Sequence, residues 1–138
     1  MSALLEGGCA CGQIRYECTA EPLFTAHCHC RDCQQASGGG MATVSGVPSA
    51  AFRVTKGTPK SFHYAGNSGK GLDRNFCPNC GARLYTNNLG ALPDVTFIAV
   101  GSLDDSSKVN PTMHIFTASA QPWDKITDGL PQYPGMPG

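Results

Sequence analysis

The amino-acid sequence predicts a mostly β protein that contains one short helix. Two observations support this prediction. Several short segments alternate apolar and polar residues, as half-buried strands do, and the 17 Gly and 10 Pro residues fall largely between these segments. No repeat or charge run divides the 138-residue chain, so we expect one domain over residues 1–138, with a core at about 8–120 and an irregular tail over 121–138.

Residues 14–18 show the clearest strand pattern. Ile14, Tyr16 and Cys18 can share one face of a strand, because side chains two positions apart point the same way. We expect this face to be buried, which makes Cys18 a core thiol rather than a reactive one. Further strands are expected over residues 51–54, 61–64, 83–86, 95–100 and 113–117.

Two histidines, His63 and His114, fall within these expected strands, beside aromatic and aliphatic residues. A hydrogen-bonded packing histidine is the commoner role in such a setting. We therefore assign neither imidazole to a functional site.

Residues 31–36 are the best candidate for a helix, which would have one or two turns. It would end at Ser37 and the glycines at 38–40, because glycine is a poor helix former. These glycines either let a ligand approach the backbone or make a tight connection, and ligand approach is the favoured interpretation. In the proline-rich tail, Trp123 is expected to act as an apolar anchor.

Charge and hydropathy limit the classes of partner. Ten Lys and Arg residues balance ten Asp and Glu residues, and charged residues make up only 14% of the chain. This composition argues against binding to nucleic acid or to an acidic membrane surface. No apolar stretch approaches the roughly 18 residues of a membrane span, and no secretion signal is visible. We therefore expect a cytoplasmic location.

The eight cysteines are the strongest chemical signal in the sequence. Disulfides rarely persist in a reducing compartment, so clustered cysteines there more often bind metal. The segment CPNCG, with Cys77 and Cys80, is typical of half a zinc site, and Cys9 and Cys11 supply two further thiols. These four cysteines predict a closed, tetrahedral structural zinc site.

A second group, Cys28, Cys30 and Cys33, has a spacing that lets a turn and a short helix aim three sulfurs at one point. Three protein ligands leave one zinc position open, as catalytic zinc sites do. An alternative is a closed site in which His27 or His29 is the fourth ligand. Disulfide pairing and an iron–sulfur cluster are weaker alternatives for the cysteines.

Four segments together resemble one known family: GGCACGQIRYEC, HCHCRDCQQASGG, NFCPNCGARLY and, near the end, HIF followed by PWD and DGLPQYPG. Over about Gly8 to Pro137 their order and spacing resemble the glutathione-dependent formaldehyde-activating enzymes, a family that includes centromere protein V. The resemblance implies antiparallel sheets in a tent-like arrangement, a β-tent, with two Zn²⁺ ions per chain. The matching cysteines would hold the structural zinc (Cys9, Cys11, Cys77 and Cys80) and the catalytic zinc (Cys28, Cys30 and Cys33).

The activity that the resemblance implies is that of a carbon–sulfur lyase, which adds glutathione to formaldehyde and gives S-hydroxymethylglutathione. The expected partners are therefore a small thiol and a small aldehyde. Basic residues are scattered along the sequence, so a related thiol fits the chain as well as glutathione does. Arg31 could pair with a substrate carboxylate, and a solvated arginine fits equally well. The alternative function is a non-catalytic zinc-binding module that holds a thiol ligand or a protein partner.

Overall fold

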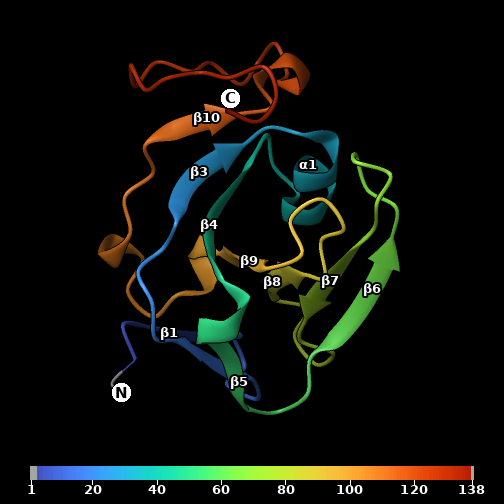
Figure 1. Ribbon diagram of the computed structural model, residues 1–138, viewed down its shortest axis with the longest axis vertical. Helices are drawn as coiled ribbons and strands as arrows, with labels where there is room; N and C mark the ends of the chain where they lie inside the picture. Colours follow the sequence, from blue (N-terminus) through green and yellow to red (C-terminus); the bar gives the residue numbers. More distant parts are fainter. Residues whose placement is uncertain (1–2, 138) are drawn as a thin grey trace.

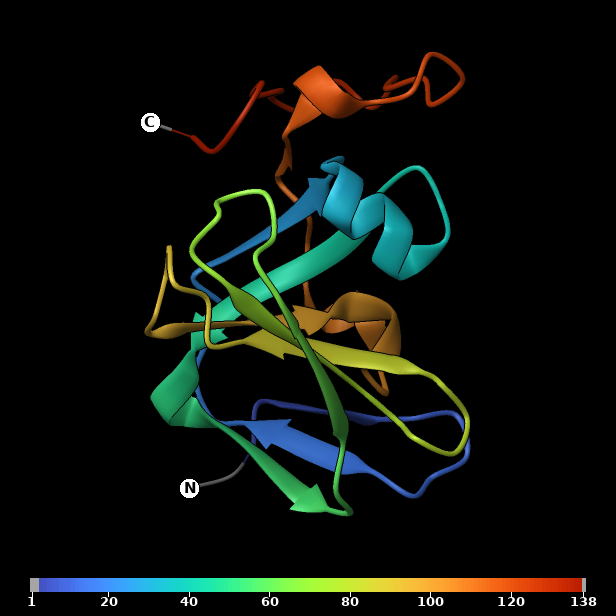
Figure 2. The same cartoon turned by 90° about the vertical axis from the view of Figure 1, so that its right-hand side faces the viewer.

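The computed structural model describes residues 3–137 and has the mostly β, two-sheet architecture that the sequence predicts, with one short α-helix. A three-stranded sheet has the order β1–β2–β5, and a seven-stranded sheet has the order β10–β3–β4–β9–β8–β7–β6. Figure 1 shows the larger sheet with the helix beside it, and Figure 2 shows the smaller sheet beneath the larger one. The two sheets make the tent-like arrangement.

The strands of the smaller sheet are β1 (Leu5–Gly8), β2 (Arg15–Cys18) and β5 (Phe52–Lys56). Those of the larger sheet are β3 (Phe24–Cys28), β4 (Ala42–Pro48), β6 (Lys60–Tyr64), β7 (Leu72–Phe76), β8 (Arg83–Asn87), β9 (Val95–Ala99) and β10 (Met113–Ile115). The α-helix is α1 (Arg31–Ser37), and single 3₁₀ turns span Ser49–Ala51, Val100–Ser102, Ser106–Lys108 and Thr117–Ser119. No helix in the described part of the chain is long and apolar enough to cross a membrane.

Strand pairing is antiparallel throughout these sheets except between β10 and β3, which pair in parallel. The main hydrophobic core joins the two sheets. Ile14, Tyr16 and Cys18 are buried in this core, where Leu84 and Ile98 of the larger sheet also lie. The predicted inward face of residues 14–18 is confirmed, and so is the buried position of Cys18.

The expectation that His63 packs inside the protein is wrong. Its side chain is 71% exposed, and its Nδ1 atom lies 2.6 Å from Oδ1 of Asp73 on the neighbouring strand. His63 belongs to β6, which is the edge strand of the larger sheet and is exposed over most of its length. An alternating sequence therefore marks a strand here but no buried face.

Residues 121–137 run irregularly along the free edge of β10, at the end of the molecule opposite the smaller sheet (Figures 1 and 2). The Tyr133 N–H donates to the carbonyl of His114, and the His114 N–H donates to that of Pro131, both at 2.9 Å. These bonds satisfy an otherwise open sheet edge. Trp123, the expected apolar anchor, is 67% exposed, and its ring lies close to one of the glycines that follow α1.

The glycines that follow α1 form a tight connection. Gly38 has a φ of 79°, which ends the helix in a left-handed conformation, and its N–H donates to the carbonyl of Gln34. A Cβ on Gly40 would lie 2.9 Å from the Trp123 ring and 3.0 Å from the Asp124 carboxylate. At Gly40 the tail makes the close approach to this backbone, which favours the alternative of a tight connection at that position.

Candidate metal centres

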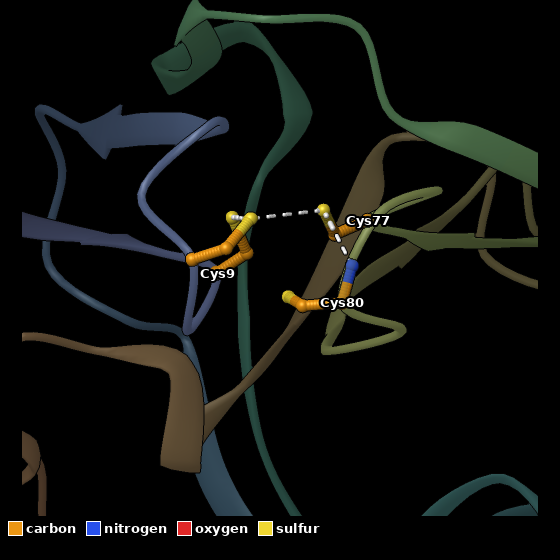
Figure 3. Close-up of side chains that lie close together, drawn as sticks. Cys9, Cys77 and Cys80 are labelled. Atoms are coloured by element: carbon orange, nitrogen blue, oxygen red, sulfur yellow. Dashed lines mark hydrogen bonds between the residues drawn. The ribbon is translucent and has the colours of Figure 1, made fainter.

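The sulfur atoms of Cys9, Cys11, Cys77 and Cys80 all lie within 4.8 Å of one another. Figure 3 shows the thiols of two loops facing one another, from the loop after β1 and from the turn between β7 and β8. Cys11 Sγ lies 3.6 Å from Cys9 Sγ and 3.7 Å from Cys77 Sγ. Zinc–sulfur bonds of about 2.3 Å in a tetrahedron place neighbouring sulfurs about 3.8 Å apart. The four-cysteine group therefore fits a tetrahedral zinc ion.

Both loops turn backbone N–H groups toward these sulfurs. The Ile14 N–H donates to Cys9 Sγ at 3.2 Å. The N–H groups of Asn79 and Cys80 donate to Cys77 Sγ at 3.4 Å. Such donors stabilise a thiolate, which is the form of cysteine that binds metal.

The four-cysteine group reaches from the core to the surface. Cys9 and Cys77 belong to the main hydrophobic core, whereas Cys11 and Cys80 are exposed. Hydrogen bonds from the backbone N–H groups of Ala82 and Cys11 lower the pKa of Cys80 to about 6. The backbone thus favours the thiolate form of Cys80, which is the form that binds metal.

A second group of thiols, Cys28, Cys30 and Cys33, comes from one continuous stretch of chain. Cys28 ends β3, Cys30 is the N-cap of α1, and Cys33 lies in the first turn of that helix. Their sulfurs also lie within 4.8 Å of one another, and all three side chains are buried. The Cys33 N–H donates to Cys30 Sγ at 3.3 Å, so the cap fixes the position of this thiol. The three-cysteine group can hold one metal ion with three protein ligands.

Neither neighbouring histidine completes the three-cysteine group. His29 is fully buried, and its Nδ1 atom lies 2.9 Å from Oδ2 of Asp124 while its Nε2 atom lies 2.8 Å from Nδ1 of His114. His27 bonds through Nδ1 to the Thr43 hydroxyl at 2.8 Å. Within residues 3–137, no histidine joins the ligand atoms of the three cysteines. The structure therefore does not support the alternative of a histidine as the fourth ligand.

The histidine contacts instead fasten the tail to the larger sheet. His114 Nε2 lies 2.8 Å from Oδ2 of Asp128, so two aspartates of the tail bracket a buried pair of imidazoles. The prediction that His114 is buried and hydrogen-bonded is confirmed. The side chains of His27, His114 and Asp128 also place potential ligand atoms within 4.8 Å of one another, as part of this attachment.

A pocket of about 140 Å³ lies directly beside the three-cysteine group. Its walls are mainly apolar, and two arginines, Arg74 and Arg83, also line it. Sequence reasoning missed both because they look like scattered charges until the pairing of β7 with β8 brings them together. Arg31 does not line this pocket, and its Nη1 atom donates instead to Gln34 Oε1 at 2.5 Å.

The buried thiols and the arginines act on one another electrostatically. Hydrogen bonds from Cys28 and Cys30 lower the pKa of Cys33, and the positive charges of Arg83 and Arg74 act in the same direction. Hydrogen bonds with Cys30 and Cys33, together with burial, raise the pKa of Cys28. One thiolate thus opposes ionisation of its neighbours, and a bound dication would offset that repulsion and allow all three to ionise.

Comparisons with known proteins agree with this arrangement. Residues 4–119 match the model of the family described as glutathione-dependent formaldehyde-activating enzyme. The chain is also similar to a crystal structure of a Rhodobacter sphaeroides protein, with 18% identity over 93% of this chain and 98% of that chain and a TM-score of 0.60, which shows a shared fold. No curated protein matches the chain. Because the family model covers most of its length, the chain belongs to the glutathione-dependent formaldehyde-activating enzyme family.

Proposed function

We propose that the protein is a zinc-dependent carbon–sulfur lyase, which adds glutathione or a related thiol to formaldehyde or another small aldehyde. The product is an S-hydroxymethyl thiol adduct or its homologue. Membership of the family supports this reaction class. The two cysteine groups support two zinc ions per chain, a structural one in the four-cysteine group and a catalytic one in the three-cysteine group.

The observation that carries the proposal is an incomplete ligand set beside a pocket. Three buried sulfurs converge, no described histidine joins them, and the pocket lies against them. A zinc ion with three protein ligands keeps one position for a ligand from outside the protein. The four-cysteine group differs because its own thiols fill a tetrahedron.

When bound, zinc supplies a Lewis acid that stabilises a substrate thiol as its thiolate. The protein backbone fixes the position of the three sulfurs that would hold this zinc ion. A strand end holds Cys28, and the start of α1 holds Cys30 and Cys33, so hydrogen-bonded backbone sets the position of each sulfur. The guanidinium of Arg83 lies beside Cys33 and offsets part of the negative charge of the thiolates.

The proposed reaction forms one carbon–sulfur bond without any change of redox state. The substrate thiol releases its proton to solvent, and the thiolate sulfur attacks the aldehyde carbon. The π electrons of the carbonyl move to its oxygen, which takes a proton from water. The reaction is therefore an addition without a leaving group. The contribution of the pocket is to hold the two reactants together.

The proposal is tested by NMR exchange spectroscopy on mixtures of labelled formaldehyde and glutathione or another small thiol. We expect the zinc-loaded protein to accelerate formation of the adduct above the rate in buffer, and Cys30→Ser to return the rate to that of buffer. A matched control is Cys18→Ala, because Cys18 is buried but lies outside both cysteine groups. This control should keep the acceleration.

Two results would contradict the proposal. The first is that adduct formation is no faster with the wild-type protein than in buffer, for every thiol tested. The alternative function, a zinc-binding module without catalysis, would then be favoured. An unchanged acceleration in Cys30→Ser would move the chemistry away from the three-cysteine group.

A further inference from the structure

Arg74 and Arg83 are the two basic residues among those that line the pocket beside the three-cysteine group. Both also line a wider, more open groove, together with Phe62 and Tyr64 of β6. The two guanidinium groups therefore stand between the inner pocket and the outer groove. A small molecule in the inner pocket can reach either cation.

The guanidinium of Arg83 lies beside the three-cysteine group. Its guanidinium interacts with Cys33, and burial lowers its pKa, as does the nearby charge of Arg74. Its Nε atom is buried, and among the described residues that atom has no hydrogen-bond partner. Arg83 is therefore the cation that lies against the sulfurs of the three-cysteine group.

Arg74 is different because its hydrogen-bond partners are neutral. Its Nε donates to the Tyr64 hydroxyl at 2.9 Å and its Nη1 donates to Thr86 Oγ1 at 3.3 Å. Asp32 lines the same pocket, but its Oδ2 accepts from the Asn67 N–H at 2.6 Å. No carboxylate within residues 3–137 forms a salt bridge with Arg74. Since a guanidinium offers five N–H donors, these contacts hold it in place and leave donors for a planar anion.

The remaining walls of the pocket favour a small, apolar ligand body. Most of the remaining lining side chains offer no hydrogen bonds, among them Val44, Leu72, Leu89, Leu92, Phe97 and Ile115. The other polar side chains of the lining are Asp32, Asn67, Ser68 and Thr86. A tripeptide thiol has several amides and charged ends, and these few polar side chains would replace only part of their hydration, which is costly. The volume of about 140 Å³ is also below the roughly 300–1,000 Å³ of sites for drug-sized ligands.

We propose that this pocket selects a small thiol whose short apolar chain ends in one carboxylate, and that Arg74 binds this carboxylate while the sulfur faces the three cysteines. The inference rests on the proposed function, because it assumes that the thiol is held at the three-cysteine group. It narrows that function to one class of thiol. Arg74 acts as a specificity-determining residue, and the apolar walls exclude larger polar thiols.

Calorimetric titration of the zinc-loaded protein tests the assignment without any turnover. The probes are mercaptopropionate and mercaptopropionamide, which have the same shape and differ in charge. We expect the wild type to bind the acid at least about tenfold more tightly, the preference expected of a charge-assisted hydrogen bond. Arg74→Met should abolish this preference while the dissociation constant of the amide stays nearly unchanged. Glutathione should bind the wild type more weakly than mercaptopropionate.

Arg53→Met is the matched control, because Arg53 lies on β5, is 73% exposed and pairs with Glu17. It should keep the wild-type preference. Equal affinity of the wild type for acid and amide would overturn the carboxylate assignment alone, and so would an equal loss of both ligands in Arg74→Met. Tighter binding of glutathione would overturn the size limit. Failure of both small thiols and glutathione to bind the wild type would overturn the proposed function as well.

Discussion

The four-cysteine and three-cysteine groups both consist of thiols, but they differ in how far apart their cysteines lie in the sequence. The first joins two loops, with Cys11 and Cys77 66 positions apart in the sequence, whereas the second comes from one short stretch, residues 28–33. By loop-closure scaling, linking a chain over the longer separation removes roughly 4 kcal/mol of unfolded-state entropy, against roughly 2 kcal/mol for the shorter. We therefore expect a metal in the four-cysteine group to stabilise the fold, and a metal in the three-cysteine group to contribute less to stability.

The largest effect is expected from Cys77→Ser. This change removes one of four ligands from the site that we propose to be structural, and Cys77 is buried in the main core. Structural zinc contributes on the order of 10 kcal/mol to folding in small zinc domains, so we expect the variant to be unfolded at 25 °C. Near-ultraviolet circular dichroism and metal content measure this outcome.

Cys18→Ala is the control for this change, because it alters another fully buried cysteine outside both groups. It should cost about 1–2 kcal/mol of unfolding free energy and keep both metals. A folded Cys77→Ser protein with native circular dichroism would show that the four-cysteine group is not needed for the fold.

An intermediate effect is expected from Gly40→Ala, which tests how the tail covers the region of the three-cysteine group. The new methyl group would lie 2.9 Å from the ring of Trp123 and 3.0 Å from Asp124. We expect the tail to shift and the contact between Asp124 and His29 to weaken, at a cost of about 1–3 kcal/mol. Trp123 is the only tryptophan of the chain, so its fluorescence reports the shift.

Gly39→Ala provides the comparison for this variant, because a Cβ there meets no atom closer than 3.9 Å. Its fluorescence should match that of the wild type. Identical spectra for Gly40→Ala and the wild type would mean that the tail does not rest on Gly40.

The smallest effect on stability is expected from Cys30→Ser. Serine is a good helix N-cap, so its hydroxyl can replace the sulfur that accepts from the Cys33 N–H. We expect the unfolding free energy to fall by about 1 kcal/mol or less, measured by urea denaturation, while the three-cysteine group loses its metal. Unfolding of this variant would make the three-cysteine group a structural site and remove the contrast between the two groups.

Local patterns predicted much of this fold. The alternation of Ile14, Tyr16 and Cys18 identified a buried strand face, and the cysteine spacing identified two groups of thiols that the structure brings together. Strand β4 escaped prediction because it lies in the middle of the larger sheet and is buried along most of its length, so its sequence does not alternate. In β1, Gly7 and Gly8 interrupt the alternation of apolar and polar residues, because glycine has no side chain.

The polar contacts that the tail and the arginines make with distant segments could not be predicted from the sequence. His29 meets His114 because β10 pairs with β3, and it meets Asp124 because the tail runs beside β10; both partners lie more than 80 positions later in the chain. Arg74 and Arg83 share a pocket only because β7 and β8 pair. The thiol groups were visible in the sequence because each consists of close local pairs or triplets, whereas these polar partners depend on tertiary structure.

Zinc per chain in the wild type and in Cys30→Ser, measured together with the folded state of each, tests the division of roles most directly. The division predicts about two zinc ions in the folded wild type and about one in a Cys30→Ser protein that is still folded. About one zinc ion in both proteins, or the unfolding of Cys30→Ser, would contradict it.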